Sequence, residues 1–276
     1  MPLANMRELI RDAQAEGRAV GAFSVSSIEM ITGVIQAAEE LRAPVILQVA
    51  EIRLPYSPLP VIGAAMRAAA EGAGVPVAVH LDHGLTFDCI RQALDCGFTS
   101  VMFDGSRLPL RDNIARTLEV IDMARPYGAA VEAEIGSVGK TESGEDAPAV
   151  CADPEEGVRF ARETGVDALA VAIGNAHGVY VGAPNLRFEV LETMRRGCDT
   201  PFVLHGGTGI TPGDFRRAID LGMRKINIAT ATFLAAYEAA REGTDYFDMS
   251  RRMTAAARGV ALRHIPMFGL AGQKEA

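Results

Sequence analysis

Short apolar runs alternate with longer amphipathic stretches along the whole chain. The runs are rich in Val, Ile and Ala, and their continuous apolar character is typical of strands buried on both faces of a parallel sheet. Eight such runs predict eight strands, at residues 19–25, 44–50, 75–82, 100–105, 130–136, 168–174, 201–207 and 225–230.

The amphipathic stretches between these runs predict helices. Examples are residues 30–42, 87–97, 110–128 and 213–222, and several of them end at a glycine, as a helix C-cap would. Eight strand-then-helix units favour a sheet that closes on itself, so the expected fold is α/β, a single (β/α)8 TIM barrel. A doubly wound open sheet is the structural alternative.

No linker, low-complexity tract or block of like charges divides the 276 residues. We therefore expect a single TIM-barrel domain over residues 1–276, with a C-terminal helical tail over about 234–276. Residues 136–155 are rich in Gly, Ser, Asp and Pro and are expected to form a long loop between strand five and its helix.

Composition limits the classes of partner. The chain is 49% hydrophobic and 22% charged, as globular proteins are, and its net charge of -8 disfavours nucleic acid and anionic membranes. It has no basic-then-apolar leader and no apolar stretch near the roughly 20 residues that span a bilayer, so we expect a cytoplasmic protein. The spacing of the four cysteines fits neither a metal pair nor a disulfide framework, and they are expected to be free: Cys89, Cys96, Cys151 and Cys198.

Four of the five histidines lie at or just past the ends of predicted strands three, six and seven: His80, His83, His177 and His205. The carboxyl ends of barrel strands converge on one face, where active sites of this fold are built. Three imidazoles from three strands can surround one divalent ion and leave positions open for substrate. We therefore expect His83, His177 and His205 to bind a metal, although any one of them could be an ordinary hydrogen-bonded histidine.

Carboxylates accompany these histidines. Strand alternation sends His80 and Asp82 to one face and leaves His83 on the turn beyond, so Asp82 could move a proton to or from a substrate hydroxyl, or merely orient a histidine. Asp104 ends strand four, and Glu132 and Glu134 lie two apart on strand five. Asp104 and Glu134 could hold a second or alternative metal position, or could be carboxylates satisfied by backbone N–H groups.

Two small-residue turns follow strands seven and eight, in HGGTGITPGDF (205–215) and NIATATF (227–233). Each leads into a predicted helix, and the turns after strands seven and eight form the usual phosphate site of these barrels. The pair predicts a phosphate ester as ligand, although a lone Gly-Gly is often only a tight turn.

At this point the chain resembles the class II fructose/tagatose-bisphosphate aldolase family, which makes or breaks a carbon–carbon bond in phosphorylated ketoses with the help of zinc. The resemblance runs in order over nearly the whole chain and includes blocks similar to the inositol-catabolic aldolase branch. It is carried by HLDHG (80–84), SVMFDGS (100–106), VEAEIGSVG (131–139), AIGNAHGVY (172–180), VLHGGTGI (203–210) and KINIAT (225–230).

The resemblance implies residue roles. His83, His177 and His205 would bind Zn2+, and Asp82 would exchange a proton with the hydroxyl on the carbon whose bond breaks. The mobile-loop glutamate of the family falls on Glu142, which would exchange the proton of the enediolate. The phosphate-contacting positions fall on Gly178, Gly206, Gly207, Thr208, Asn227, Ile228, Ala229 and Thr230, with a monovalent cation (Na+ or K+) nearby, and Asp104 and Glu134 match an alternative metal site.

The lysines disfavour a class I aldolase, which needs a lysine midway along a strand inside the barrel. Lys140 is expected in a loop, Lys225 before strand eight and Lys274 in the tail. Zinc chemistry would instead stabilise the negative charge that develops beside the carbonyl of a dihydroxyacetone phosphate unit.

Three departures from the family pattern concern the substrate. Ser24, a position expected to contact the ketose, replaces the usual Asn; residues 51–60 (EIRLPYSPLP) replace a Gly/Ser-rich loop; and Lys140 replaces a Gly in the lid. The family grips the distal phosphate with a C-terminal arginine, for which Arg251, Arg252 and Arg258 are candidates or members of a solvated helix face. A metal-dependent hydrolase and a non-catalytic sugar-phosphate binding protein are the alternative functions, and family members are commonly homodimers or homotetramers.

Overall fold

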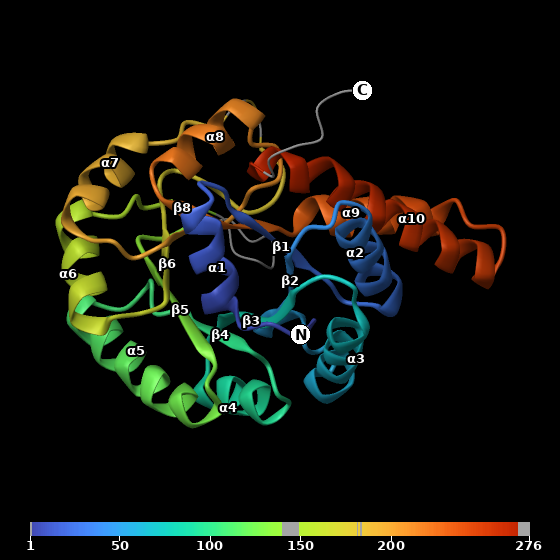
Figure 1. The fold of residues 1–276 in the computed structure, drawn as a ribbon, viewed down its shortest axis with the longest axis horizontal. Coiled ribbons are helices and arrows are strands. Elements are labelled where there is room, and N and C mark those ends of the chain that lie inside the picture. The colour runs from blue at the N-terminus through green and yellow to red at the C-terminus, as the bar shows by residue number, and fades with distance from the viewer. Residues whose placement is uncertain (1, 140–148, 181, 183, 270–276) are drawn as a thin grey trace.

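Eight parallel strands close into a barrel in chain order, β1 to β8 (Figure 1). This computed structural model describes residues 2–139, 149–180, 182 and 184–269. The closed barrel confirms the predicted (β/α)8 fold and excludes the open sheet. The strands are β1 (Val20–Ser24), β2 (Val45–Ala50), β3 (Val77–Gly84), β4 (Ser100–Phe103), β5 (Ala130–Ile135), β6 (Ala168–Val171), β7 (Phe202–Leu204) and β8 (Met223–Ile228).

Helices surround the barrel as an outer ring (Figure 1). Caps mark the ends of several of them: the Ser27 side chain accepts from the backbone N–H of Met30 at the start of α2, and the backbone of Gly165 ends α6 in a left-handed conformation. The helices are α1 (Met6–Ala15), α2 (Ile28–Glu40), α3 (Leu59–Gly72), α4 (Phe87–Asp95), α5 (Leu110–Ala124), α6 (Pro154–Thr164), α7 (Phe188–Gly197), α8 (Pro212–Asp220), α9 (Thr230–Arg241) and α10 (Tyr246–His264), with short 3-10 turns η1 (Glu51–Arg53), η2 (Arg125–Tyr127) and η3 (Ile265–Phe268).

Strand alternation divides the interior from the helix-facing layer. On β5, Val131, Ala133 and Ile135 join the large core between the sheet and the outer helices. Ala130, Glu132 and Glu134 point the other way, into the barrel, and all six side chains are buried. The side chains of β5 that face the outer helices are therefore apolar, whereas those that point into the barrel include charged ones.

Helix α1 closes the amino-terminal end of the barrel. Its apolar face packs on small and branched residues of the strands, and it contacts β1, β3 and β8. The segment before it pairs with β3, where the backbone N–H of Ala4 donates to the carbonyl of Val77 at 2.8 Å. The floor cluster consists of Ala4, Met6, Leu9, Ile10, Ala13, Val20, Ala22, Ile46, Ala78, Ala130, Ala168, Ala170 and Val203.

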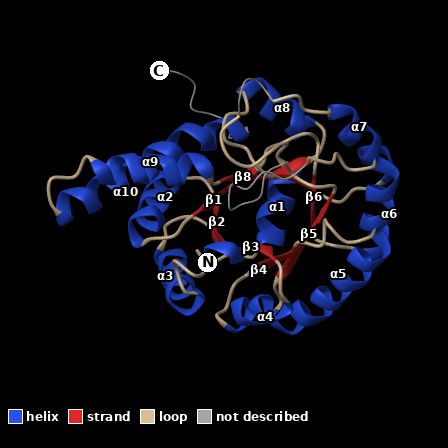
Figure 2. Ribbon diagram, turned by 180° about the vertical axis from the view of Figure 1, so that it is seen from behind, coloured by secondary structure: helices blue, strands red, loops and turns tan. Residues whose placement is uncertain are grey.

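Helices α9 and α10 extend away from the ring on one side, with α10 packed along α2 and α9 (Figure 2). The helical region begins at Thr230, four residues before the start predicted for the tail. Its outer surface carries Tyr237, Tyr246 and Phe247, which are 59%, 67% and 81% exposed. Among the described residues no helix combines the length and apolarity that crossing a membrane requires.

The placement predicted for Lys225 was wrong. Strand β8 begins at Met223, so Lys225 lies inside the strand rather than before it. The apolar pattern did not reveal this early start of β8, because Arg224 interrupts the apolar run. The Arg224 side chain is folded back onto the carbonyls of Ile219 and Met223. His83, expected on the turn after strand three, lies within the last residues of β3.

Candidate active site at the barrel mouth

His83 is placed by an irregular strand end. The pairing of β3 with β4 shifts register between Leu81 and Gly84, and His83 has a positive φ of 42°, rare for a residue with a side chain. Such backbone strain is found where function demands a particular side-chain direction. The Nδ1 atom of His83 then lies 2.9 Å from Asp104 Oδ2, which fixes the ring.

His177 lies in the loop between β6 and α7. Its backbone N–H donates to the carbonyl of Gly139 at 2.8 Å, at the base of the long loop after β5. Two side chains tie its loop to the next turn: Asn175 Nδ2 donates to the carbonyl of His205 at 2.9 Å, and the Tyr180 hydroxyl donates to the carbonyl of Gly206 at 2.9 Å. The segment bearing His177 is therefore held against the segment bearing His205.

His205 follows β7 directly and is 1% exposed. Its Nε2 atom lies 2.9 Å from Glu132 Oε1, and its Nδ1 atom lies 3.3 Å from Glu134 Oε2. Because a carboxylate can only accept, the first contact requires a proton on Nε2. The Nδ1 atom is then the one available to a metal ion, as in the carboxylate–histidine–metal arrangement.

The structure brings the three histidines together, as the sequence predicts. Their ring centroids are 5.1 Å (His83–His177), 4.6 Å (His83–His205) and 6.1 Å (His177–His205) apart. Each ring has one nitrogen that lies within 4.8 Å of a nitrogen of each of the other two rings. The buried His83 Nε2 and His205 Nδ1 atoms make no hydrogen bond within the described residues. Converging nitrogens of this kind fit a divalent ion with open coordination positions.

Neighbouring carboxylates keep these imidazoles basic. Burial alone would lower the pKa of His83, but Asp82 and Asp104 outweigh it and hold the pKa well above its ordinary value. Burial is likewise outweighed at His205, where Glu132 and Glu134 raise the pKa to about 9. The site is thus built to concentrate positive charge, whether protons or a metal ion.

Asp82 sits beside this group with both carboxylate oxygens hydrogen-bonded. Asn227 Nδ2 donates to Oδ1 at 3.1 Å, and Gln48 Nε2 donates to Oδ2 at 2.9 Å. Gln48 also donates to Ser24 Oγ at 3.1 Å. Asp82 is fully buried by the protein, and amides from β2 and β8 fix the plane of its carboxylate. The sequence pattern did not indicate this role for Gln48, which lies opposite His80 in the pairing of β2 with β3.

Asp104 and Glu134 also reach the histidines. With His83 they form a second group whose ligand atoms lie within 4.8 Å of one another. Asp104 accepts from the backbone N–H and hydroxyl of Ser106, so it is not held by backbone N–H groups alone. Burial would raise its pKa, but His83 and Ser106 lower it, which keeps the carboxylate charged.

The predicted phosphate turns lie side by side. The backbone N–H of Gly207 donates to the carbonyl of Asn227 at 3.0 Å, and Thr208 Oγ1 accepts from the N–H of Ala231 at 3.1 Å. Gly206 has a φ of 63°, and a Cβ there would lie 2.2 Å from the carbonyl oxygen of Ala176. Ile228 ends β8, and Ala229 and Thr230 open α9 without a side-chain cap. Thr208 therefore takes the place of a cap within α9 by accepting from the N–H of Ala231.

The remaining predicted positions are a glycine beside His177, two residues of the segment after β5 and three arginines of α10. Gly178 follows His177 directly and has a φ of 88°, and Glu142 and Lys140 fall outside the described residues. The three arginines of α10 pair with carboxylates of their own chain: Arg251 with Asp248, Arg252 with Asp248 and Glu242, and Arg258 with Glu40.

Hydrogen bonds with the segments after β1 and β3 hold residues 51–60 in place. Glu51 accepts from the backbone N–H groups of Leu85 and Thr86 and from the Thr86 hydroxyl, which ties the segment after β2 to the segment after β3. A serine closes the other side, since Ser57 Oγ donates to the carbonyl of Ser26 at 2.8 Å. This segment is therefore an ordered wall next to β1 and β3.

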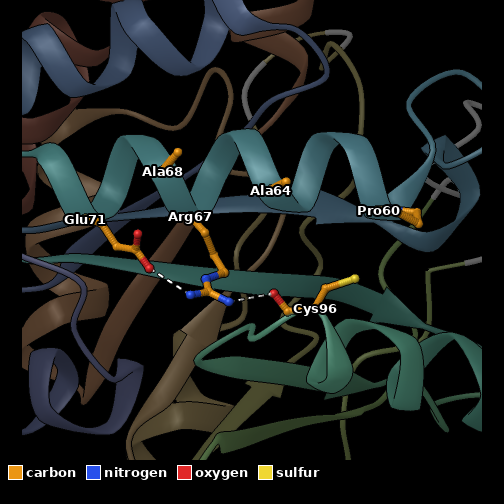
Figure 3. Close-up of a pocket in the computed structure, with 6 residues that line it drawn as sticks. All are labelled: Pro60, Ala64, Arg67, Ala68, Glu71 and Cys96. Carbon is orange, nitrogen blue, oxygen red and sulfur yellow. Dashed lines mark hydrogen bonds and ion pairs between the residues drawn. The ribbon is translucent and has the colours of Figure 1, made fainter.

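A surface groove between α3 and the end of α4 lies apart from the histidines (Figure 3). Arg67 crosses it and donates to Glu71 Oε1 at 2.8 Å and to the carbonyl of Cys96 at 3.3 Å. Burial raises the pKa of the Cys96 thiol, so that thiol is not activated as a nucleophile. The groove joins two helices of the outer ring and holds none of the predicted site residues.

A closed barrel whose mouth gathers imidazoles and carboxylates is typical of metal-dependent barrel enzymes. The family described as "Fructose-bisphosphate aldolase class-II" matches residues 4–273. The chain belongs to this family and is a class II aldolase, a lyase that makes or breaks a carbon–carbon bond. The match confirms the resemblance and the predicted reaction, and gives no support to a hydrolase or a non-catalytic binding protein.

Individual relatives agree with the family match. The chain is 42% identical to a probable fructose-bisphosphate aldolase of Bacillus subtilis over 246 residues, 88% of this chain and 86% of the relative. It is also 42% identical to a 6-phospho-5-dehydro-2-deoxy-D-gluconate aldolase of Bacillus subtilis, over 85% of this chain and 82% of that one. Its fold matches the YdjI aldolase of Escherichia coli K12 with a TM-score of 0.88 and 36% identity, over 98% of each chain.

Proposed function

We propose that this class II aldolase binds Zn2+ through His83, His177 and His205 and cleaves or forms a bond that releases or consumes dihydroxyacetone phosphate. The observation that carries the proposal is the convergence of these three imidazoles, one nitrogen of each within 4.8 Å of the others. The family membership supplies the reaction class. Asp104 and Glu134 would form an alternative position for the ion with His83.

Bound Zn2+ would polarise the carbonyl and adjacent hydroxyl oxygens of the substrate and so stabilise the negative charge that develops beside the carbonyl. The residues do the remaining work. Asp82 exchanges a proton with the hydroxyl on the carbon whose bond breaks, while Gln48 and Asn227 hold both of its oxygens in place. Glu142 exchanges the proton on the carbon next to the carbonyl.

The phosphate lies at the adjacent turns after β7 and β8. Gly206, Gly207 and Thr208 form one side of this site, Asn227, Ile228, Ala229 and Thr230 form the other, and Gly178 lies beside the first. The start of α9 supports this position, because the positive end of a helix favours an anion. A monovalent cation, Na+ or K+, would bind the carbonyls near these turns.

The substrate class follows from what the two Bacillus subtilis relatives have in common. Fructose bisphosphate and 6-phospho-5-dehydro-2-deoxy-D-gluconate both yield dihydroxyacetone phosphate when cleaved beside the ketone, but they yield different aldehydes. The chain is 42% identical to both relatives, so identity favours neither aldehyde. We therefore assign dihydroxyacetone phosphate as one product. We further propose that Ser24 and residues 51–60 contact the part of the substrate that becomes the aldehyde.

Three broader proposals accompany this assignment. The chain forms one domain over residues 1–276 and works in the cytoplasm. It assembles into a homodimer or homotetramer, which the exposed Tyr237, Tyr246 and Phe247 of the α9–α10 arm support as a contact surface. Light scattering of the purified protein tests the assembly, and a monomer at micromolar concentration would refute it.

The decisive experiment separates metal dependence from the choice of aldehyde. Protein stripped by a chelator and protein reloaded with Zn2+ are each incubated with dihydroxyacetone phosphate in D2O, and deuterium uptake next to the carbonyl is followed by mass spectrometry. We expect uptake in the reloaded protein alone. The reloaded protein is then screened with dihydroxyacetone phosphate and a panel of aldehydes, and adducts are identified by mass.

Two variants serve as controls. His177→Ala should lose both zinc and deuterium uptake, whereas His264→Ala, in the helical arm, should keep both. Full exchange activity in excess chelator after prolonged dialysis would rule out the zinc proposal. Zinc-dependent activity on other substrates without exchange of dihydroxyacetone phosphate would rule out the substrate class alone.

A further inference from the structure

Lys225 is the one lysine among the described residues, and its side chain is fully buried in the barrel interior. Its Nζ atom lies 2.9 Å from Glu132 Oε2 and donates to Asn227 Oδ1 at 2.8 Å. A buried ammonium is costly unless it is paired and hydrogen-bonded. Lys225 meets both conditions, so its role lies in what these two partners do.

The first partner leads to a metal ligand. Glu132 is fully buried, and while its Oε2 atom faces Lys225, its Oε1 atom accepts from His205 Nε2. The Lys225 Nζ atom holds the carboxylate of Glu132 from one side while His205 Nε2 holds it from the other. A carboxylate can only accept, so this contact keeps the proton of His205 on Nε2 and leaves Nδ1 directed at the metal position.

The second partner leads to the carboxylate that transfers protons. An amide side chain can bind in either of two orientations, and the ammonium of Lys225 can only donate, so the Asn227 atom facing it must be the oxygen. The Asn227 NH2 group is thereby directed at Asp82, where it donates to Oδ1 at 3.1 Å. One ammonium therefore determines the direction of hydrogen bonds at two functional groups.

His80 lies beside the ion pair of Lys225 and Glu132. It is fully buried, its Nε2 atom lies 3.6 Å from Glu132 Oε2, and its Nδ1 atom lies 2.9 Å from Ser100 Oγ. Burial and the adjacent Lys225 lower the pKa of His80 well below its ordinary value. Neutral His80 leaves Lys225 as the cation that balances Glu132 from this side of the barrel.

We propose that Lys225 is a positioning residue that orients His205 through Glu132 and Asp82 through Asn227, coupling the metal ligand to the proton-transfer group. The inference rests on the proposed function, since it uses the roles of His205 and Asp82 given there. Lys225 does not act as a Schiff-base nucleophile, because its Nζ atom is engaged by Glu132 and Asn227.

The test uses the double variant Lys225→Met with Glu132→Gln, which removes both buried charges at once and leaves an oxygen that can accept from His205. Zinc affinity is measured by competition with a coloured chelator, cleavage by kcat and KM, and folding by the melting temperature. We expect zinc affinity to fall about 10- to 100-fold. The kcat of zinc-saturated protein should fall because Asp82 is misdirected, and KM measured alongside reports separately on Asn227 at the phosphate site.

Arg224→Met is the matched control. Arg224 is also buried, lies next in the chain, and points away from the interior onto backbone carbonyls. Its variant should melt earlier and keep the zinc affinity and kcat of the wild type. Wild-type zinc affinity and kcat in the double variant would overturn the inference, as would failure of the double variant to fold while Arg224→Met folds. A wild-type protein that needs no zinc would instead refute the proposed function.

Discussion

The Nδ1 atom of His205 faces the Oε2 atom of Glu134 at 3.3 Å inside the barrel mouth, and the two atoms make no hydrogen bond. In the neutral imidazole with its proton on Nε2, a nitrogen lone pair would face a carboxylate oxygen. That arrangement is repulsive unless a proton or a metal ion lies between the two atoms. Protons and metal therefore compete for the same position.

This competition makes zinc affinity depend on pH. The pKa of His205 is raised to about 9, so this ring carries an extra proton at neutral pH without metal, and the pKa of His83 is raised as well. Zinc must displace the proton of His205 to reach Nδ1. We predict that the dissociation constant falls at least about 10-fold per pH unit from pH 6 to 8, measured by chelator competition. In Glu134→Gln the slope should decrease, and a flat profile in the wild type would contradict the prediction.

The stability of the metal-free protein should depend on the same groups. A histidine with a raised pKa in the folded state stabilises the fold fully below its unfolded pKa of about 6.5, and that contribution disappears as pH rises through the folded pKa. For His205 this loss falls between about pH 6.5 and 9 and amounts to roughly 3 kcal/mol. Urea unfolding of metal-free protein at pH 6.5, 7.5 and 9 measures it. Stability that rises across this range would refute the assignment.

The two acids proposed for proton transfer should fail in different assays. Asp82→Asn should keep zinc and deuterium exchange of dihydroxyacetone phosphate but lose at least about 100-fold in cleavage, because Asp82 serves the hydroxyl of the breaking bond. Glu142→Gln should lose the exchange. Glu145→Gln, in the same segment, is the matched control and should resemble the wild type. Loss of exchange in Asp82→Asn with zinc bound would show that the roles are assigned wrongly.

Gly206 should not tolerate a side chain. Gly206→Ala adds a positive φ of 63° to a Cβ contact of 2.2 Å with the carbonyl of Ala176, so the phosphate turn must move. Gly17→Ala is the control for φ alone, since Gly17 has a φ of 65° and open space around its Cβ position. We expect Gly17→Ala to cost about 1 kcal/mol of unfolding free energy and Gly206→Ala more, with weaker phosphate binding. Equal losses would remove the case for crowding at the turn.

The strands were predictable because each depends on a local apolar run, and all eight were found. Alternation within β3 also predicted that the side chains of His80 and Asp82 lie on the same face of the strand. His83 was harder to place, because the bulge that turns it depends on pairing with β4 rather than on neighbouring residues. Lys225 was misplaced because Arg224 interrupts the apolar run ahead of it, and its partner Glu132, on β5, comes near only when the barrel closes.

The seal that α1 and its preceding residues place across the barrel bears on how the protein can be tagged. The backbone N–H of Val77 donates to the carbonyl of Pro2, and the N–H of Ala4 donates to the carbonyl of Val77. These two bonds hold residues 2–4 against β3. Removing residues 2–4 would leave the N–H and carbonyl of Val77 without these partners at the amino-terminal end of β3. A purification handle should therefore leave residues 2–4 in place.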